Sequence, residues 1–405
     1  MTILVLAGGA DQIALIQELK KYGHEIVLVD YLQNPPAKHY ADKHIIASTL
    51  DIQAVTQIAI DEKADLVTTA CTDQALLTVA KVSELLKLPC YISYQTALNV
   101  TNKSYMKKVL HDNHIPTAKY TIVKSFNDPI LKDFAYPLVV KPVDCNSSKG
   151  VKKVVGPELL QDALQEALNF SRSHSAVVEE FKEGKELSVD CYVDNSSVKL
   201  LSVTASNKIA NTNSFTILQS YYPAITESDE NCIEKIAQQI ADAFDLKNTP
   251  LLIQMIQKES DFSILEFSAR MGGGSKYKFI EVLSGVNIMS AYVNLILGNP
   301  VQVHPSKQVN FASMNYIYCN KGTLDRVVKL EELKQKGVID DFFLYKTKGM
   351  KIEKAETSSD RPAGFLITAS TQSEMLNKLR EADDAIQVLD EYGIDIMKHG
   401  LYFNE

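Results

Sequence analysis

The sequence predicts an α/β protein that begins with a parallel-sheet domain and continues into α+β units. Two patterns lead to this prediction. In the first hundred residues, short apolar runs alternate with segments of helical periodicity, as in a parallel sheet covered on both faces. From about residue 120 to residue 193, short strands dominate around one helix, which is typical of a small α+β unit inserted in a larger one.

The elements expected in the first domain are short. Strands are predicted over residues 3–7, 25–30 and 66–69, and another begins near Ile45. Helical periodicity covers residues 13–22 and 73–86.

Further along, a polar helix over residues 102–113 is stopped by Pro116, and the helix of the inserted unit covers residues 158–170. The chain is predicted to end in a helix over 372–389 and a strand over 394–397.

These elements suggest three parts: an N-terminal domain (1–100), a central domain (101–300) with a lid at about 118–195, and a C-terminal α+β portion (301–405). The sequence has no Pro/Gly-rich linker, so we expect the parts to pack against one another.

Charge and composition exclude several functional classes. Lys and Arg total 42 against 50 Asp and Glu, for a net charge of −8, whereas a protein that tracks nucleic acid needs a basic face. A few lysines still suffice to bind a small anion such as ATP. The N-terminus lacks the basic region of a secretory signal, and no segment approaches the ~20 apolar residues that span a bilayer.

The six cysteines are scattered and form no C-x-x-C pair, so reduced thiols are expected rather than disulfides or a metal cluster. We therefore expect a cytoplasmic protein that binds neither membrane nor nucleic acid.

The first motif is an apolar strand that ends at Lys141 and leads into a polar loop with Ser147, Ser148 and Gly150. A lysine in this position can reach a phosphate, while the N–H groups of the loop surround the outer phosphates. Gly150 would let the backbone approach closely. The alternative is a lysine that ends a strand before a solvated hairpin.

The second motif is an acidic, hinge-like turn between two strands, which contains Glu179, Glu180 and Phe181 and is followed by Glu186. One carboxylate can accept a hydrogen bond from an adenine amino group and another can accept both ribose hydroxyls. The alternative is an acidic surface hairpin, since exposed carboxylates are the rule.

The third motif is a strand hairpin in which Gln254 lies on the first strand and Glu266, Ser268 and Arg270 share one face of the second. Three polar groups on one face of an apolar strand are costly unless something pairs with them. Mg²⁺ with a triphosphate would pair with them, because carboxylates bind hard cations and arginine binds the negatively charged oxygens of phosphoryl groups. An internal Glu–Arg pair on a solvated face is the alternative.

In this order, the three motifs resemble the ATP-grasp superfamily between about residues 102 and 287, with weaker similarity at both ends. The similar enzymes are carboxylate–amine ligases: L-amino-acid ligases, purine-pathway enzymes and relatives of carbamoyl-phosphate synthase. Two further family features match, a lysine early in a helix (Lys103) and a closing segment over residues 284–287. The resemblance implies a Rossmann-like N-terminal domain followed by an ATP-grasp fold of two α+β units.

The resemblance also implies roles for the motif residues. Lys103 and Lys141 would bind ATP phosphates, together with Ser147, Ser148 and Gly150 of the loop. The adenosine would be held by Glu179, Glu180, Phe181 and Glu186.

The third motif would hold the metal ions. Glu266 would be the main ligand of Mg²⁺ (or Mn²⁺), with Gln254 nearby, and Arg270 would face the transferred phosphoryl group. The family's usual E-x-N-x-R reads Glu266-x-Ser268-x-Arg270 here, so a hydroxyl or a water would be the ligand of a second metal ion.

The reaction implied is the ATP-dependent formation of an acyl phosphate, which an amine then attacks to give an amide or dipeptide bond. Small-molecule carboxylates and amines are the expected partners, and a homodimer is one assembly the chain could form. Two alternatives stay open: a carboxyphosphate-forming enzyme of the same superfamily, and a nucleotide-binding module without turnover.

A dinucleotide-binding crossover is a third reading of the N-terminus, motivated by Gly8, Gly9 and Asp30. However, the third glycine of G-x-G-x-x-G is missing.

Overall fold

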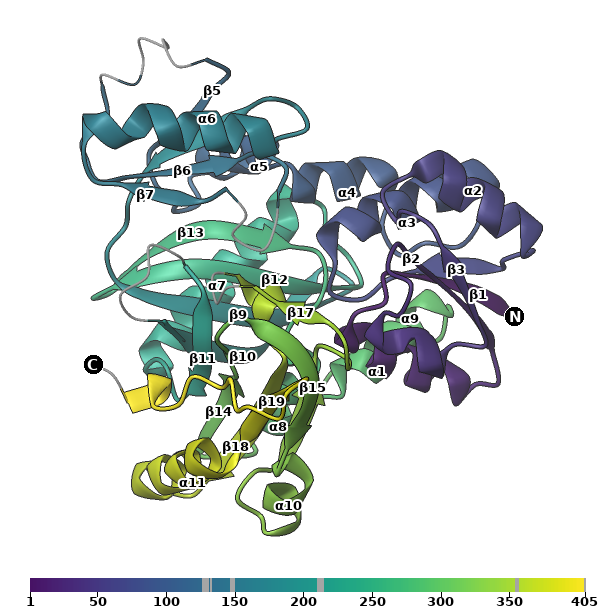
Figure 1. Cartoon of the computed structure of the whole chain (residues 1–405). Helices are drawn as coiled ribbons and strands as arrows, with labels where there is room; N and C mark the ends of the chain where they lie inside the picture. Colours follow the sequence, from purple (N-terminus) through teal and green to yellow (C-terminus); the bar gives the residue numbers. More distant parts are fainter. Residues whose placement is uncertain (126–130, 132, 146–149, 210–214, 354–356, 404–405) are drawn as a thin grey trace.

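The computed structural model describes residues 1–125, 131, 133–145, 150–209, 215–353 and 357–403. Four sheets organise this part of the chain, and Figure 1 shows the N-terminal sheet and the sheet around β6 on different sides of the central strands.

The N-terminal sheet is parallel, with the strand order β3-β2-β1-β4. Its elements are β1 (Thr2–Leu6), α1 (Ala10–Lys20), β2 (Glu25–Asp30), the 3₁₀ helix η1 (Pro36–Tyr40), β3 (Lys43–Ile46), α2 (Ile52–Asp61), β4 (Leu66–Thr68) and α3 (Asp73–Leu86). Leu4 and Leu6 pack with residues of α2 and α3, whereas Ile3 and Val5 pack with α1. The expected parallel sheet with both faces covered is confirmed.

Two helices, α4 (Tyr94–Thr101) and α5 (Lys103–Asp112), lead from this sheet to a four-stranded sheet that we call the small sheet. Its strand order is β5-β8-β6-β7, and it carries α6 on one face. The elements are β5 (Tyr120–Val123), β6 (Leu138–Pro142), β7 (Lys152–Val154), η3 (Pro157–Leu159), α6 (Leu160–Phe170) and β8 (Ala176–Glu180).

The large sheet has eight antiparallel strands in the order β13-β12-β9-β10-β11-β14-β18-β16. Its strands are β9 (Lys185–Asp194), β10 (Ser197–Lys208), β11 (Ile217–Tyr222), β12 (Thr249–Lys258), β13 (Asp261–Ser268), β14 (Phe311–Tyr316), β16 (Asp341–Leu344) and β18 (Ala363–Ala369). One face packs on α7 (Glu227–Ala243), and α8 (Lys276–Ser284) and α9 (Ile288–Ile296) follow β13.

A three-stranded sheet, β17-β15-β19, completes the C-terminal part. It consists of β15 (Gly322–Val328), β17 (Lys351–Ile352) and β19 (Gln387–Asp390), and the neighbouring helices are α10 (Leu330–Gln335), η4 (Ser358–Asp360), α11 (Gln372–Ala385) and η5 (Leu401–Phe403).

The last elements differ from the sequence prediction. α11 ends at Ala385 instead of residue 389, because the backbone of Ile386 is extended and the chain enters β19. Val388 and Asp390 are buried while Gln387 is exposed, the alternation of a strand rather than a helix. Residues 394–397, expected as a strand, make only isolated bridges.

The segment predicted as the lid, at about residues 118–195, contributes to two different sheets in the structure. The small sheet ends at Glu180, and β9 is an inner strand of the large sheet. β9 lies there because its apolar residues Leu187, Val189 and Cys191 belong to the core beneath the large sheet.

All six cysteines are free thiols. Among the described residues no single helix could span a membrane by length and hydropathy; α8 and α9 meet that criterion only together, across a bend of 112°.

Candidate active site

A row of four polar side chains crosses four neighbouring strands of the large sheet. Gln254 on β12 pairs with Glu266 on β13 and with Ser188 on β9, and Ser188 pairs with Thr204 on β10. Residues paired directly across strands point to the same face. The opposite face packs on α7, so the alternation of these strands puts the polar row on the other face.

A β-bulge on β13 adjusts this face next to Glu266. The pairing register shifts between Gln254 and Met255, so Leu265 has no partner of its own on β12. Regular alternation along this strand would place Leu265 and Phe267 together on the face opposite Glu266. Phe267 is buried, but Leu265 is only partly covered.

Lys103, the first residue of α5, extends to Glu266 across the space between helix and sheet. Its Nζ lies 3.2 Å from Glu266 Oε2 and donates to the carbonyl of Cys145 at 2.8 Å. Burial acts to raise the pKa of Glu266, but the ammonium groups of Lys103 and Lys141 hold it below its usual value. Glu266 is therefore ionised, and its side chain remains 38% exposed.

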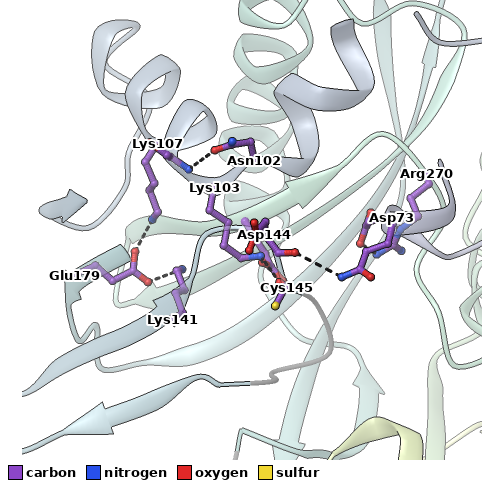
Figure 2. A network of polar contacts seen from close by, with 12 residues as sticks. Asp73, Asn102, Lys103, Lys107, Lys141, Asp144, Cys145, Glu179 and Arg270 are labelled. Atoms are coloured by element: carbon purple, nitrogen blue, oxygen red, sulfur yellow. Dashed lines mark hydrogen bonds and ion pairs between the residues drawn. The ribbon is translucent and has the colours of Figure 1, made fainter. Parts of the chain in front are cut away.

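A buried carboxylate between two lysines joins α5 to the small sheet (Figure 2). Glu179 Oε1 lies 2.6 Å from Lys141 Nζ, and Glu179 Oε2 lies 2.8 Å from Lys107 Nζ. Burial acts to raise the pKa of Glu179, yet the two lysines lower it to about 2. The three side chains carry one net positive charge.

Arg270 is held by an aspartate that the sequence analysis did not select. Its Nε donates to Asp73 Oδ1 at 2.5 Å, and its Nη2 contacts the other carboxylate oxygen. Burial acts to raise the pKa of Asp73, but Arg270 and a hydrogen bond with Ser268 lower it. Asp73 lies at the start of α3, so this pair connects the N-terminal sheet to the third motif.

Glu180, Phe181 and Glu186, the other residues predicted at the hinge, each contact a different lysine. Glu180 pairs with Lys182 at 3.3 Å, and Lys153 Nζ lies 3.7 Å from the centre of the Phe181 ring. Glu186, on β9, pairs with Lys208 of β10 at 2.5 Å.

Gly150 has a φ of +69°, the left-handed region that favours glycine, and a Cβ there would lie 2.9 Å from the Phe170 ring. Ser147 and Ser148, predicted to surround the phosphates, lie outside the described residues.

Charges of both signs surround the glycines that follow Arg270. Gly274 and Ser275 donate backbone N–H bonds to Asp11 at 3.1 and 2.8 Å. A Cβ on Gly274 would lie 3.1 Å from Arg361 Nη1, and the Arg361 guanidinium stacks on Tyr316 at 3.7 Å. Segments from both ends of the chain therefore meet at this loop.

The N-terminal glycines serve the fold itself. Gly8 donates its N–H to Asp30 at 2.6 Å, and a Cβ on Gly8 would lie 2.5 Å from Pro35. Asp30, the residue expected to bind a ribose in a dinucleotide site, is thus bonded to its own glycine turn.

The chain is similar to several known proteins. Residues 101–274 match the family model described as "Phosphoribosylglycinamide synthetase, ATP-grasp (A) domain". A phosphoribosylamine–glycine ligase from Leptospira interrogans is 25% identical over 312 residues, which cover 70% of this chain and 72% of the relative. Residues 101–274 are therefore identified as an ATP-grasp domain, and the chain as a whole is similar to carboxylate–amine ligases.

Solved ATP-grasp structures cover almost the whole chain. An L-amino acid ligase from Bacillus licheniformis superimposes with a TM-score of 0.81 and 22% identity, over 96% of this chain and 98% of that one. A phosphoribosylglycinamide synthetase from Anaerococcus prevotii gives a TM-score of 0.74 and 19% identity, over 96% and 99%. These two likenesses show the fold.

Several charged residues of the candidate site were missed by the sequence analysis, among them Asp11, Asp73, Lys107 and Arg361. Lys107 could have been found, because it follows Lys103 by one helical turn and shares its face. Asp73 follows a buried strand at the start of a helix, a common place for functional side chains. Arg361 had no local signal, because only the tertiary fold brings it to Gly274.

Proposed function

We propose that this ATP-grasp protein uses ATP and Mg²⁺ to convert a carboxylate into an acyl phosphate and joins the acyl group to an amine. The observation that carries the proposal is the convergence of Lys103, Lys141 and Glu266 from a helix and two different sheets. The charges that coordinate a metal–triphosphate complex are thereby available from one side of the large sheet.

ATP would lie between the small sheet and the polar row of the large sheet. Lys103 and Lys141 bind its phosphates, with Gly150 and the loop before it. Phe181 and Glu180 of the hinge hold the adenine. Glu179, expected from the sequence to share this role, is buried with both carboxylate oxygens at Lys107 and Lys141, so it acts through those lysines instead. Glu186 accepts the ribose hydroxyls, and its ion pair with Lys208 orients the carboxylate.

The donor set fits Mg²⁺. Glu266 and Gln254 are direct cross-strand partners and offer one carboxylate and one amide oxygen on the same face. The described residues contain no group of three or more His, Cys, Asp or Glu suited to a metal ion. Mg²⁺ commonly binds through one or two carboxylates, with phosphates and waters as the other ligands.

Ser268, the residue at the second metal position, is hydrogen-bonded to Asp73. We propose that a water rather than Ser268 would complete that second site. When bound, the metal supplies charge stabilisation for the transferred phosphoryl group.

In the first step, an oxygen of the substrate carboxylate attacks the γ-phosphorus, and the bond to the β–γ bridging oxygen breaks to release ADP. Lys141 and Arg270 stabilise the phosphoryl charge, by positioning and electrostatics rather than through a covalent enzyme intermediate. Asp73 fixes the orientation of the Arg270 guanidinium for this task.

In the second step, the amine nitrogen attacks the acyl carbon, the C–O bond to the phosphate breaks, and the amine loses a proton. Phosphate and the amide are the products. The small sheet would act as the lid that excludes water, because an acyl phosphate open to solvent hydrolyses.

The substrates would lie beside the loop after Arg270. Asp11 and Arg361 offer opposite charges at Gly274, which suits small polar molecules that carry both amine and carboxylate groups. The three-part division of the chain, a cytoplasmic location and a homodimeric assembly complete the proposal.

The test is a screen for ADP and phosphate release over pairs of amino acids and small carboxylic acids, with product masses determined. We expect release that requires both substrates and matches amide formation one to one. Turnover that depends on bicarbonate alone would instead support carboxyphosphate formation. ATP binding without turnover for any pair would contradict the ligase activity.

A further inference from the structure

Lys107 is a fully buried lysine that cannot itself touch a ligand. It lies on α5, its exposure is 0%, and its neighbours on the buried face of the helix include Met106 and Leu110. An apolar residue would fill this position at no electrostatic cost, whereas a buried ammonium is expensive unless it is paired.

Three oxygen atoms surround the Lys107 ammonium. Its Nζ lies 2.6 Å from Thr117 Oγ1, 3.2 Å from the carbonyl oxygen of Ile264 and 2.8 Å from Glu179 Oε2. Ile264 belongs to β13, and Glu179 to β8 of the small sheet. Lys107 therefore links α5 to both sheets at the site, and Figure 2 shows its contact with Glu179 of the small sheet.

The charges of this group explain what Lys107 adds. Glu179 alone would neutralise Lys141, and an ion pair without net charge attracts a triphosphate weakly. With Lys107 the group carries one net positive charge. Lys107 also occupies one oxygen of Glu179, so that the other oxygen faces Lys141 and fixes the position of its ammonium.

We infer that Lys107 is a positioning residue for ATP binding: through Glu179 it holds Lys141 in place and keeps the group positively charged toward the phosphates. The inference rests on the proposed function, in which Lys141 binds ATP. Lys107 contacts no reactant, so its loss should weaken ATP binding much more than it slows turnover at saturating ATP.

The effect should depend on pH. Burial lowers the pKa of Lys107 to about 8, an effect that the Glu179 and Glu266 carboxylates oppose and the Lys141 ammonium reinforces. As the pH rises through 8, Lys107 loses its proton and the group loses its net charge. Affinity for ATP should therefore fall between pH 7.5 and 9.5.

The experiment measures ATP affinity by calorimetry with Mg²⁺ present, for the parent protein and for Lys107→Met, Lys107→Arg and Lys108→Met. Lys108 is the matched control, because it lies on the same helix with 69% of its side chain exposed and pairs with Asp112. We expect Lys107→Met to raise Kd at least tenfold and to change kcat less than threefold, and Lys108→Met to behave as the parent.

Two further results separate charge from packing. Lys107→Arg keeps its proton at all these pH values and should bind ATP with a flat pH profile. The double variant Lys107→Met with Glu179→Gln restores one net positive charge and should recover part of the affinity lost in Lys107→Met.

Parental affinity in Lys107→Met, or identical pH profiles for the parent and Lys107→Arg, would overturn the inference. If Lys107→Met does not fold, the comparison of the parent with Lys107→Arg decides the question. Failure of the parent itself to bind ATP would overturn the proposed function instead, so the two results are distinguishable.

Discussion

Single residues at this site act in pairs that come from distant parts of the chain. Lys103 faces Glu266, and Arg270 faces Asp73. Each pair joins two elements, and each balances a buried or half-buried charge that would otherwise be costly. The charges of the site are therefore preorganised before any ligand binds, which is how catalysis by electrostatics avoids reorganisation during the reaction.

Glu266 should be the residue on which turnover depends most. Phe267 packs in the core behind Glu266, and the Glu266 carboxylate remains partly exposed on the polar row. We expect Glu266→Gln to lower kcat by on the order of 100-fold, with a smaller effect on ATP binding. Steady-state phosphate release measured against Mg²⁺ concentration tests this.

Ser268→Asn is the companion variant. It restores the common family residue, so we expect near-parental turnover and equal or tighter Mg²⁺ dependence. Near-parental turnover of Glu266→Gln at saturating Mg²⁺ would show that the metal binds elsewhere.

At the scale of elements, the loop between β13 and α8 connects the site to the C-terminal part. Gly274 has a φ of +72°, and a Cβ there would lie 2.8 Å from the Tyr316 hydroxyl. That hydroxyl donates to the Gly274 carbonyl at 3.0 Å. The loop is thus fixed both by its backbone conformation and by its contact with β14.

Substitution of two glycines separates these effects. Gly298 has a φ of +74° but nothing within 4 Å of its Cβ position, so Gly298→Ala should cost only the left-handed backbone strain, about 1 kcal/mol. Gly274→Ala adds a steric clash and should cost more, about 2–3 kcal/mol, and should also reduce turnover. Chemical denaturation measures the stability, and equal losses for the two variants would contradict the role of the Tyr316 contact.

At the scale of the whole molecule, the site lies where three parts meet. The small sheet provides Lys141 and Glu179, the large sheet provides Glu266, and the N-terminal sheet provides Asp73 through α3. A ligand bound among them should stabilise their arrangement together, because it binds the folded protein and not the unfolded chain.

We therefore expect ATP with Mg²⁺ to raise Tm by several degrees. At a hundredfold excess over Kd, the stabilisation is about 2.7 kcal/mol. NAD should give no shift, since Asp30 is bonded to Gly8. A thermal-shift series measures both ligands, with Lys141→Met as the variant expected to respond less to ATP. A larger shift with NAD than with ATP would reverse the assignment.

The sequence by itself determined the order of the elements and most candidate residues. Alternation of apolar and polar residues placed Gln254 and Glu266 on strands, and the helical period predicted α3 with its exact bounds of 73–86. Both patterns are local, because they depend only on residues that are close together in the sequence. The bulge at Leu265 was not predicted, because it depends on the exact register between β12 and β13, and β19 was not predicted, because it forms by pairing with the distant strand β15.

Tertiary structure alone decided which charges meet. Asp73 and Arg270 are 197 residues apart, and nothing local in either segment indicates the other. The same holds for Glu179, which reads as one of several acidic residues in a hinge but is buried between Lys107 and Lys141. The paired cations lower the pKa of Asp73 and Glu179 against the effect of burial, and both pairing and burial depend on what packs around a residue in the folded chain.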